Sequence, residues 1–566
     1  MMYPKTAICA GLLSQALPAY GAVMEKLAAA PSGWTAASET DSSAAITLTV
    51  GLAMQNLDQL EAKLLAVSTP GNAEYGNHLD IDEANALFAP SADASSAVTS
   101  WLTSAGAQNI VSDGSTISFA TTIEKANSML NAKFKSYTSN GVTKVRTTQY
   151  SVPDDVAEHI ELISPTTYFG KTVANAPTKI AKRDTSATKV TVDAACSTSI
   201  TPKCIKELYN IGDYTPSVSS GSRIGFGSFL NQSALYTDLF QYESYFGIPE
   251  QNFTVTLING ATNDQNEATA QIGEANLDVQ NIIGVAHPLP VQEFITGGSP
   301  PFIPNVDLPT EADNSNEPYL PYYEYLLSQP NSALPQVISN SYGDDEDTVP
   351  YAYAVRVCNL IGIMGLRGIS VLESSGDTGV GAGCVANDGL NTPYFQPQFP
   401  GTCPYITSVG GTQAVAPEVA WDDGSGGFSN YFPTAWYQVA AVDEYLNKHI
   451  SPSTKEYYES YTNFSGRGFP DISAHSLTPD YQVVYFGELS PSGGTSAAAP
   501  VIAGALNDIT GGASVGCNGV NGQTGAKVPG GAVIPYASWN ATKGWDPVTG
   551  LGTPNFEKLK ALVLSY

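Results

Sequence analysis

The sequence predicts an α/β fold, a parallel sheet with helices on both faces, preceded by a smaller α+β domain of antiparallel strands. After residue 195, apolar strands alternate with helical stretches, which is typical of a parallel sheet covered on both sides. Before residue 176, short strands and helices follow one another closely, which favours antiparallel pairing. A Pro-containing segment with the dibasic pair Lys182-Arg183 separates the two patterns.

The first half opens with a strand predicted at 44–54, because Ile46, Leu48 and Val50 occupy alternate positions. A helix is predicted at 57–67, where Leu57, Leu60 and Leu64 recur at helical spacing. The other elements predicted in this half are helices at 93–104 and 123–133 and strands at 115–121 and 144–150.

The second half contains the sheet. Its predicted strands are 223–230, 252–258, 336–341, 369–375 and 405–410, with helices at 266–286 and 350–366. Ligands of such sheets bind beyond the carboxyl ends of the strands. We therefore expect the functional residues in the loops that leave these strands.

Composition excludes several classes of function. The 566 residues include 53 Asp and Glu against 25 Lys and Arg, a net charge of -28, although only 14% of residues are charged. A nucleic-acid binder needs basic surface, and so does a protein attracted to an anionic membrane, so we expect neither partner. The 10% aromatic content argues against disorder. Because carboxylates lose their charge in acid, the balance favours a protein that tolerates low pH.

The first 21 residues have the layout of a secretory signal peptide. Lys5 precedes the apolar stretch 7–17, and the small residues Ala19 and Gly21 precede the expected cleavage point. A short buried helix is the alternative. A secreted, extracellular protein is the favoured interpretation, and four glycosylation sequons agree with it, at Asn231, Asn252, Asn463 and Asn540.

Cysteine usage fits the same compartment. Cys9 leaves with the signal peptide, so an even number of cysteines remains, namely Cys196, Cys204, Cys358, Cys384, Cys403 and Cys517. An even number in a secreted chain indicates disulfides. The sequence leaves their pairing open, with Cys196–Cys204 as a plausible local bridge. The Lys182-Arg183 pair is interpreted as a processing site rather than as two solvated charges, since it lies between two domains.

The strongest chemical signal surrounds Ser496, in the segment S-G-G-T-S-A-A-A-P from Ser492 to Pro500. The glycines permit a tight turn and Pro500 suits the first turn of a helix, so the Ser496 hydroxyl would sit at a helix N-terminus. An ordinary N-cap serine is the alternative. A serine nucleophile needs a base, yet none of the five histidines stands in an H-G-T context.

Two carboxylates in the helix predicted at 266–286 offer a base. Glu274 and Asp278 are one turn apart, opposite an apolar stripe made by Ile272, Ala275, Val279, Ile282 and Ile283. Such a face usually meets water, and a cleft is the alternative. Two like charges one turn apart destabilise a helix. Sharing of a proton between them would raise one pKa, as a base for acid conditions requires.

Asp377 is the third candidate, in E-S-S-G-D-T-G at the end of the strand predicted at 369–375. If protonated, its carboxyl can donate a hydrogen bond to an oxyanion. An Asx-turn residue is the alternative.

Together these motifs resemble the sedolisins, serine-carboxyl peptidases with a subtilisin-like fold, and among them the secreted fungal tripeptidyl-peptidases. G-T-S-x-x-x-P resembles the subtilisin-like nucleophile motif. The other segments that carry the resemblance are E-A-N-L-D-V-Q at Glu274, S-S-G-D-T-G at Asp377, F-P-G-T-C-P-Y-I-T-S-V-G-G-T from Phe399, G-R-G-F-P-D-I-S-A from Gly466, and W-D-P-V-T-G-L-G-T-P-N-F from Trp545.

The resemblance implies roles for the candidate residues. Ser496 would be the nucleophile, Glu274 its base, Asp278 the residue that orients Glu274, and Asp377 the oxyanion donor. The implied reaction removes tripeptides from polypeptides with a free N-terminus through an acyl-enzyme. The implied organisation is a signal peptide at 1–21, a pro-domain at 22–183 that acts as inhibitor and chaperone, and a monomeric peptidase domain at 184–566.

The resemblance also implies one structural Ca²⁺ near the C-terminus. The matching positions are the carboxylates of Asp508 and Asp546 and the backbone carbonyls of Ile509 and Gly544, with the Thr542 carbonyl as a further oxygen. Calcium takes six to eight oxygen ligands of these kinds.

One departure from the family pattern follows Ser496. Only eleven residues separate it from Asp508, where relatives have a longer segment, and eleven residues form about three helical turns at most. The segment is either a true deletion that weakens the core behind Ser496 or an error in the gene model. The alternative functions are a sedolisin-type endopeptidase, a non-catalytic relative, and a secreted glycoside hydrolase with paired carboxyls.

Overall fold

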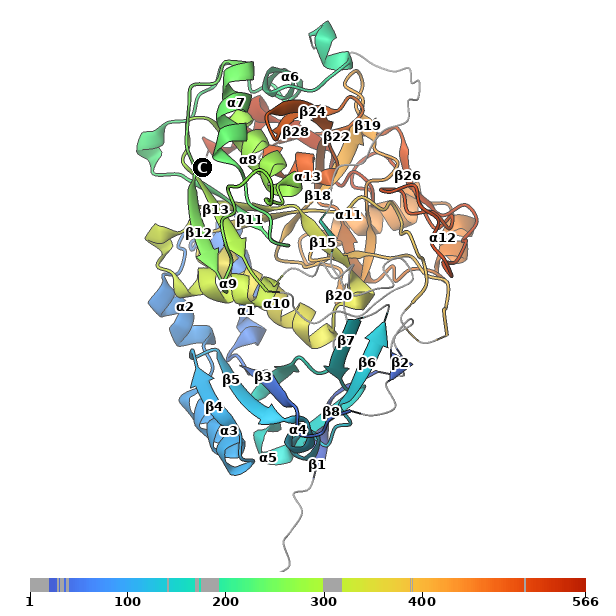
Figure 1. The fold of residues 1–566 in the computed structure, drawn as a ribbon. Helices are drawn as coiled ribbons and strands as arrows, with labels where there is room; N and C mark the ends of the chain where they lie inside the picture. The colour runs from blue at the N-terminus through green and yellow to red at the C-terminus, as the bar shows by residue number, and fades with distance from the viewer. Residues whose placement is uncertain are drawn as a thin grey trace, which may run out of the picture.

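The computed structural model describes residues 20–27, 30, 35–36, 40–139, 142–167, 173–174, 193–298, 318–386, 388, 390–502 and 505–565. These residues form two domains, a smaller N-terminal one drawn in blue and cyan and a larger one drawn from green to red (Figure 1). The predicted signal peptide lies outside them except for its last two residues, and so does Lys182-Arg183.

The N-terminal domain is an antiparallel sheet with helices on one face, as predicted. Its strand order is β4-β5-β3-β9. The bounds are β3 Ala45–Leu52, β4 Gln108–Ser112, β5 Thr116–Thr122, β9 Ile160–Ser164, α3 Ala92–Ser104, α4 Ile123–Met129 and α5 Asp154–Ala157. Leu48 and Val50 point into a core that Val98 and Leu102 of α3 complete. The alternating apolar residues predicted at 44–54 therefore form the buried face of β3.

Short strands extend this domain towards the larger one. They are β1 Tyr20–Lys26 with β8 Gln149–Pro153, and β2 Thr35–Ala36 with β6 Lys135–Ser139 and β7 Val142–Arg146. The single strand predicted at 144–150 is wrong, because the chain leaves β7 and then pairs with β1 instead. Thr147 makes the break, since its N–H donates to the Thr166 carbonyl and its hydroxyl to the Gln149 carbonyl.

The larger domain confirms the predicted α/β class. Its parallel strands run in the order β12-β13-β11-β14-β16-β18-β22, and β19 adds antiparallel to β18. Their bounds are β11 Ile224–Ser228, β12 Thr254–Ile258, β13 Val291–Thr296, β14 Val337–Asn340, β16 Ser370–Ser374, β18 Thr407–Gln413, β19 Val419–Ala420 and β22 Ile472–Leu477. The sequence reading missed β13 and β22.

Helices cover both faces of this sheet, so its strands are apolar on both sides. On one face lie α7 Tyr236–Phe246 and α8 Gly273–Ala286, and on the other α9 Tyr319–Ser328 and α10 Tyr351–Leu366. The helix predicted from residue 266 begins only at Gly273. The Asp264 side chain accepts from the Asn266 N–H and the Thr269 hydroxyl, which holds residues 264–269 in a turn.

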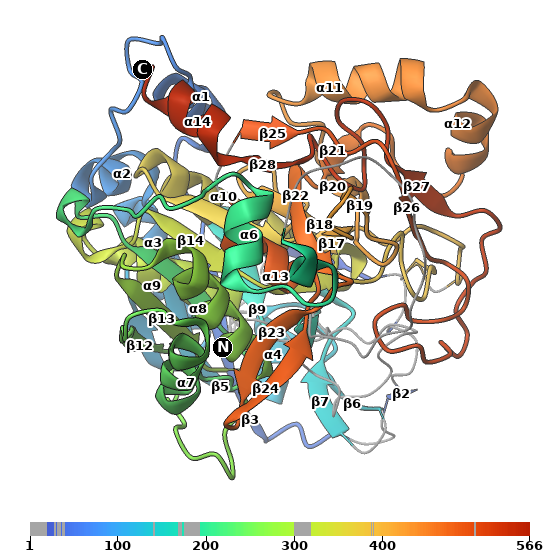
Figure 2. The same cartoon turned by 90° about the horizontal axis from the view of Figure 1, so that it is seen from above.

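The remaining elements of the described chain lie outside this sheet. Figure 2 shows the hairpin of β23 Tyr481–Tyr485 and β24 Glu488–Ser492 beside α7 and α8. The others are α6 Pro202–Leu208, β10 Val173–Ala174, β15 Tyr342–Asp345, β17 Gln398–Phe399, β20 Gly427–Pro433, α11 Val439–Glu444, α12 Pro452–Tyr458, β21 Gly466–Phe469, α13 Thr495–Ala498, β25 Ala505–Asn507, β26 Ala513–Val515, β27 Ser538–Asn540, β28 Thr553–Asn555 and α14 Phe556–Val563.

Three disulfides cross-link the larger domain. The predicted local bridge Cys196–Cys204 is confirmed. Cys358 bonds Cys403, and Cys384 bonds Cys517 across 133 residues of sequence. No helix in the described chain has the length and apolarity that a membrane span requires.

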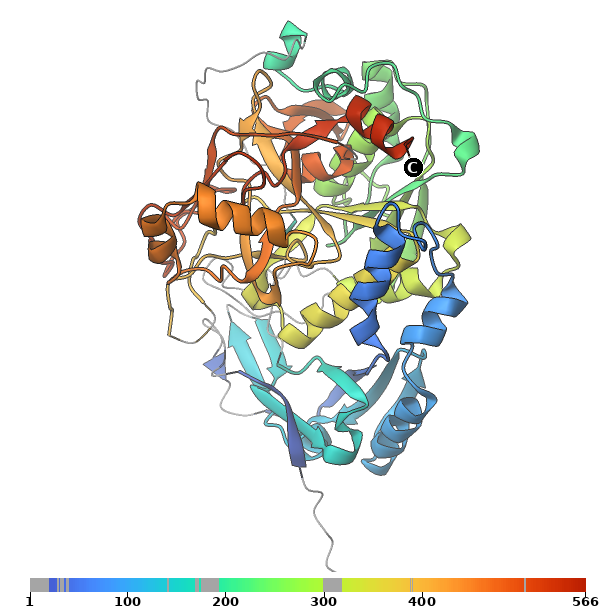
Figure 3. The ribbon, with the colours of Figure 1, turned by 180° about the vertical axis from the view of Figure 1, so that it is seen from behind.

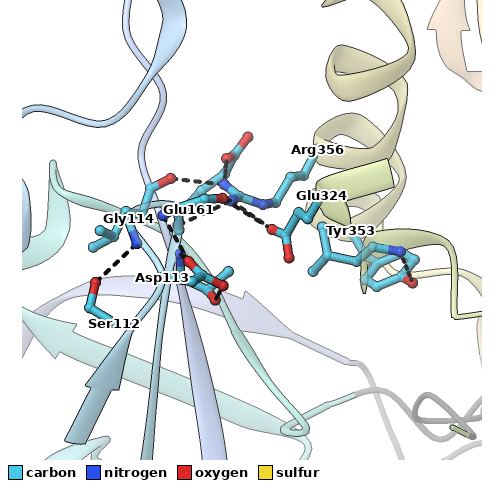
Figure 4. A network of polar contacts seen from close by, with 11 residues as sticks. Ser112, Asp113, Gly114, Glu161, Glu324, Tyr353 and Arg356 are labelled. Carbon is cyan, nitrogen blue, oxygen red and sulfur yellow. Dashed lines mark hydrogen bonds and ion pairs between the residues drawn. The ribbon is translucent and has the colours of Figure 1, made fainter. Parts of the chain in front are cut away.

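The two domains meet across α10. Helices α1 Leu60–Ser68 and α2 Ile81–Phe88 belong to the N-terminal half of the chain but pack on α10, as the blue and yellow helices show in Figure 3. Next to them the fully buried Arg356 of α10 donates to the Glu161 carboxylate at 2.6 Å and to Glu324 at 3.1 Å. It also donates to the carbonyls of Leu52 and Ser115 (Figure 4). One guanidinium thus joins three segments of the N-terminal domain.

Candidate active site

All four predicted catalytic residues converge at the carboxyl ends of β14 and β16. Ser496 comes from α13, Glu274 and Asp278 from α8, and Asp377 from the loop after β16. Their side chains are buried, with at most 3% of each residue exposed. Segments more than 200 residues apart in sequence thereby form one site, where parallel sheets of this kind place their ligands.

Ser496 lies in a very short helix. Gly494 precedes it with φ 92°, a left-handed conformation that glycine adopts readily, and α13 then spans only Thr495–Ala498. The Ser496 Oγ donates to the carbonyl oxygen of Ser341 at 3.3 Å. The turn-then-helix prediction is confirmed, but a helix of four residues and one 3₁₀ turn contributes little dipole.

Glu274 and Asp278 are fully buried, so the expectation that they face water is wrong. The turn after β14 and α13 cover the two carboxylates, since the Ser341 hydroxyl donates to Asp278 and the Ser496 hydroxyl lies against Glu274. β23 covers another side of the helix. Asn276 and Gln280 of α8 donate to the Val484 carbonyl of β23. The polar face of this helix therefore contacts protein, which periodicity alone does not reveal.

Burial decides the protonation of this pair. It raises the pKa of Glu274 well above its usual range, and repulsion from Asp278 adds to the effect, while the hydroxyls of Ser496 and Ser341 oppose it. Burial likewise raises the pKa of Asp278, although the Ser341 hydroxyl bonded to it opposes the rise. Two carboxyls in one dry site cannot both ionise easily.

Asp377 is held next to the nucleophile by Thr495. Its Oδ1 accepts from the Thr495 N–H at 2.9 Å and from the Thr495 hydroxyl at 2.7 Å. Burial raises the pKa of Asp377 to about 7, even though both hydrogen bonds favour its charged form. Because Oδ1 is occupied as an acceptor twice, the proton of the neutral form belongs on Oδ2.

Ser341 is a site residue that the sequence reading missed. Its hydroxyl donates to Asp278 Oδ1 at 2.7 Å and lies 3.5 Å from the backbone oxygen of Ser496. Ser341 therefore contacts both Ser496 and Asp278. Its position at the end of the strand predicted at 336–341, and directly after the observed β14, was the available signal, since site residues follow such strands.

Two further buried carboxyls stand next to Asp278. Glu293 of β13 accepts from the Ser228 hydroxyl, and burial raises its pKa to about 8. Glu373 of β16 accepts from the Tyr342 N–H at 3.3 Å, and burial raises its pKa well above the usual range.

Histidine plays no comparable part here: burial lowers the pKa of His475 to about 3, so its ring is neutral.

The short segment after Ser496 is well packed. Ala497, Ala498 and Ala499 are fully buried in a core with Leu372 and Val409 of the sheet. The segment makes four helical residues and a 3₁₀ turn instead of the three turns that its length allows. From Ser496 to Ile502 the apolar side chains therefore lie inside, and residues 503 and 504 are outside the described chain.

The predicted calcium ligands also lie together. Asp508 accepts from the Gly544 N–H at 3.0 Å, and the fully buried Asp546 accepts from the Thr542 N–H at 2.8 Å. Both carboxylates thus meet the loop 542–546. Among the described residues, no three His, Cys, Asp or Glu side chains cluster as metal ligands, so a cation here would depend on backbone oxygens.

Comparison with known proteins shows to which family the chain belongs. The family "Pro-kumamolisin, activation domain" matches residues 32–169. Tripeptidyl-peptidase sed4 of Aspergillus fumigatus is 58% identical over 595 aligned positions that cover 100% of both chains. The chain belongs to the sedolisin family, among its fungal tripeptidyl-peptidases. This sedolisin is thus a serine-type tripeptidyl-peptidase made as a zymogen, as predicted.

Two further known proteins are similar to this chain over most of their own length. The probable tripeptidyl-peptidase SED2 of Arthroderma benhamiae is 38% identical and covers 95% of each chain. The structure of Pseudomonas sedolisin, a serine-carboxyl proteinase, covers 65% of this sedolisin and 98% of that chain, at 19% identity and a TM-score of 0.42. The alignment with sed4 is longer than the 566 residues of this chain, so sed4 carries segments that this sedolisin lacks.

Proposed function

We propose that this sedolisin is secreted as a zymogen and, in acid surroundings, releases tripeptides from polypeptides with a free N-terminus through an acyl-enzyme on Ser496. The observation that carries the proposal is the convergence of one hydroxyl and three buried carboxyls, Glu274, Asp278 and Asp377, on a single site. A serine with a carboxyl base and a protonated carboxyl donor is a complete apparatus for acyl transfer.

In the first step the Ser496 Oγ attacks the carbonyl carbon of the third residue, and its proton passes to Glu274. Asp278 holds the shared proton and orients Glu274. Asp377 donates the proton on Oδ2 as a hydrogen bond to the developing oxyanion, where such a donor is worth about 10²–10³ in rate. Glu274 then protonates the leaving amine, and the acyl-enzyme remains.

In the second step water attacks the ester carbonyl and gives its proton to Glu274. The tetrahedral intermediate collapses, the tripeptide leaves with a carboxyl group, and Ser496 regains its proton. Because Glu274 must accept a proton while Asp377 keeps one, the two pKa values have to bracket the working pH. Carboxyls meet this condition in acid, which supports an acidic optimum.

An extended peptide can reach Ser496 along β15. The described strand β10 pairs antiparallel with β15, with Val173 opposite Gly343 and Ala174 opposite Tyr342. This chain therefore runs towards Ser341, the neighbour of Ser496. A substrate bound in the same way gains backbone hydrogen bonds, as in other cases of strand addition. The pairing supports a polypeptide substrate.

We assign the chain a signal peptide at 1–21, a pro-domain at 22–183 and a monomeric peptidase domain at 184–566. The activation-domain match at 32–169 falls inside the second segment. The acidic balance, the three disulfides and the sequons support an extracellular location.

We also assign one Ca²⁺ to Asp508, Asp546 and the carbonyls of Ile509 and Gly544. The residues fit a hard cation. Asp546 is fully buried, and the partners recorded for its carboxylate are N–H and O–H donors of Thr542, Val548 and Thr549. The Thr542 hydroxyl is another buried oxygen, without a hydrogen-bond partner in the described chain. A bound Ca²⁺ would neutralise the carboxylates and fasten the loop 542–546.

The test compares a peptide with a free N-terminus and its N-acetylated form, both at pH about 4, where a Glu base titrates. The proposal expects the processed wild type to release the tripeptide from the free peptide alone, and Ser496→Ala and Glu274→Gln to release none. Cleavage of the acetylated peptide would establish the endopeptidase instead. A folded, processed protein that cleaves neither peptide would establish a non-catalytic relative.

A further inference from the structure

Glu373 is a buried carboxyl that has no role in the proposed mechanism. It lies close in sequence to the loop that holds Asp377. It lies at 0% exposure on β16, one residue before the end of the strand. Its direct partner on the neighbouring strand β14 is Asn340, the residue before Ser341. Burial of an acid in a sheet interior is costly unless its oxygens are used.

Glu373 uses one oxygen to fix a turn. Its Oε1 accepts from the Tyr342 N–H at 3.3 Å, on the far side of Ser341 from Asn340. Asn340 is held in turn by the hydroxyls of Tyr322 and Tyr323 of α9, each at 3.2 Å. Both residues that flank Ser341 are therefore anchored in the sheet.

The turn between them carries the contacts of the active site. The Ser341 carbonyl accepts from the Ser496 Oγ at 3.3 Å, and the Ser341 hydroxyl donates to Asp278 at 2.7 Å. A shift of this turn would lengthen both hydrogen bonds at once. Misplacement of reacting groups by about 1 Å can cost about 10²-fold in rate.

We propose that Glu373 is a positioning residue of the peptidase reaction, which holds the Ser341–Tyr342 turn and, through Ser341, aligns Asp278 and Ser496. The inference rests on the proposed function, because it assigns a role within the same reaction. Glu373 itself touches neither Ser496 nor Glu274 in the hydrogen bonds of the described residues.

The test is a double-mutant cycle in the full-length chain, processed and assayed on the free tripeptide reporter. Glu373→Met keeps the volume of the side chain but removes the acceptor for Tyr342. We expect it to lower kcat about 10- to 100-fold with little change in KM. In a Ser341→Ala background, which lacks the hydroxyl contact with Asp278 but keeps the carbonyl contact with Ser496, the same substitution should lower kcat by a clearly smaller factor.

Two variants separate positioning from a general loss of stability. Glu373→Gln keeps an acceptor oxygen at the same reach and should retain kcat within about 3-fold of the wild type. Glu373→Asp draws the acceptor back by one methylene and should lose activity, and it serves if the Met variant fails to fold. Glu418→Gln is the control, since Glu418 is a partly buried carboxyl bonded to Tyr209 and Thr553 away from the site.

Each outcome decides one question. Full activity of a folded Glu373→Met or Glu373→Asp would overturn the inference and leave the proposed function intact. Equal losses of kcat on both backgrounds would overturn it too, because they would mean that Glu373 acts independently of Ser341. A wild type that releases no tripeptide would overturn the proposed function and this inference together.

Discussion

Arg356 and Glu161 join the two domains through an ion pair of 2.6 Å, in which the guanidinium is fully buried and the carboxylate side chain is 16% exposed. Arg356 is part of the peptidase domain, and Glu161 lies on the edge strand β9 of the N-terminal sheet. A buried charge that loses its partner is costly, by about 3–5 kcal/mol. The pair therefore holds the N-terminal domain on the zymogen.

We expect Arg356→Met to weaken that attachment. The zymogen should lose its N-terminal domain to limited proteolysis faster than the wild type does, at neutral pH. Arg467→Met is the matched control, since Arg467 is a second fully buried arginine and pairs with Asp471 inside the larger domain. Equal proteolysis of wild type and Arg356→Met would contradict the assignment.

The buried carboxyls predict that the protein is more stable in acid than at neutral pH. Burial raises the pKa of Asp377 to about 7, of Glu293 to about 8 and of Glu418 to about 6. Between pH 5 and 7 the folded state therefore binds more protons than the unfolded one, and the free energy of unfolding falls as pH rises. Each such carboxyl contributes about 1.4 kcal/mol per pH unit.

Urea unfolding of Ser496→Ala at pH 5 and pH 7 measures this slope without self-digestion. Adding Glu293→Gln should make the slope shallower, because glutamine does not titrate. A free energy of unfolding that rises from pH 5 to pH 7 would show that these carboxyls are ionised in the folded protein.

Asp377 predicts the alkaline limit of activity. Its carboxyl donates only while protonated, so kcat should fall as pH rises through about 7. Asp377→Ala should lower kcat about 10²–10³-fold below pH about 7, and the difference from the wild type should shrink above it. Asp377→Asn can still donate through its amide, so it should keep part of the activity and lose the fall near pH 7. The measurement is kcat against pH for the three proteins.

The disulfide Cys384–Cys517 predicts a large contribution to stability. It closes 133 residues, and loop entropy assigns about 5 kcal/mol to such a closure, against about 2.5 kcal/mol for the 8-residue separation of Cys196–Cys204. Replacing each pair by alanines should therefore lower the free energy of unfolding more for the long bridge. Similar losses for the two bridges would argue against a loop-entropy origin.

Calcium removal should lower the melting temperature of the processed enzyme. The carboxylates of Asp508 and Asp546 would then repel across the loop 542–546 with no cation between them. A chelator should lower Tm in the wild type and have no further effect on Asp508→Asn. An unchanged Tm in the wild type would exclude a structural cation there.

The sequence by itself determined the local pieces of the site. Helical spacing put Glu274 and Asp278 on one face, and the end of the strand predicted at 369–375 marked the loop that holds Asp377, whereas Ser341 was not singled out. Motif resemblance supplied the family. Such features depend on neighbours within a few residues, so they can be recognised without knowledge of the fold.

Only the tertiary structure decided the environment of these residues. Ser496, more than 200 residues later, and Ser341 lie against the carboxylates of α8, and this packing turns a carboxylate pair that pattern assigned to water into a buried one. Arg356 reaches Glu161 and Leu52 in the same way. Burial, and with it every raised pKa in the site, arises from long-range packing that removes water, and no local pattern contains that information.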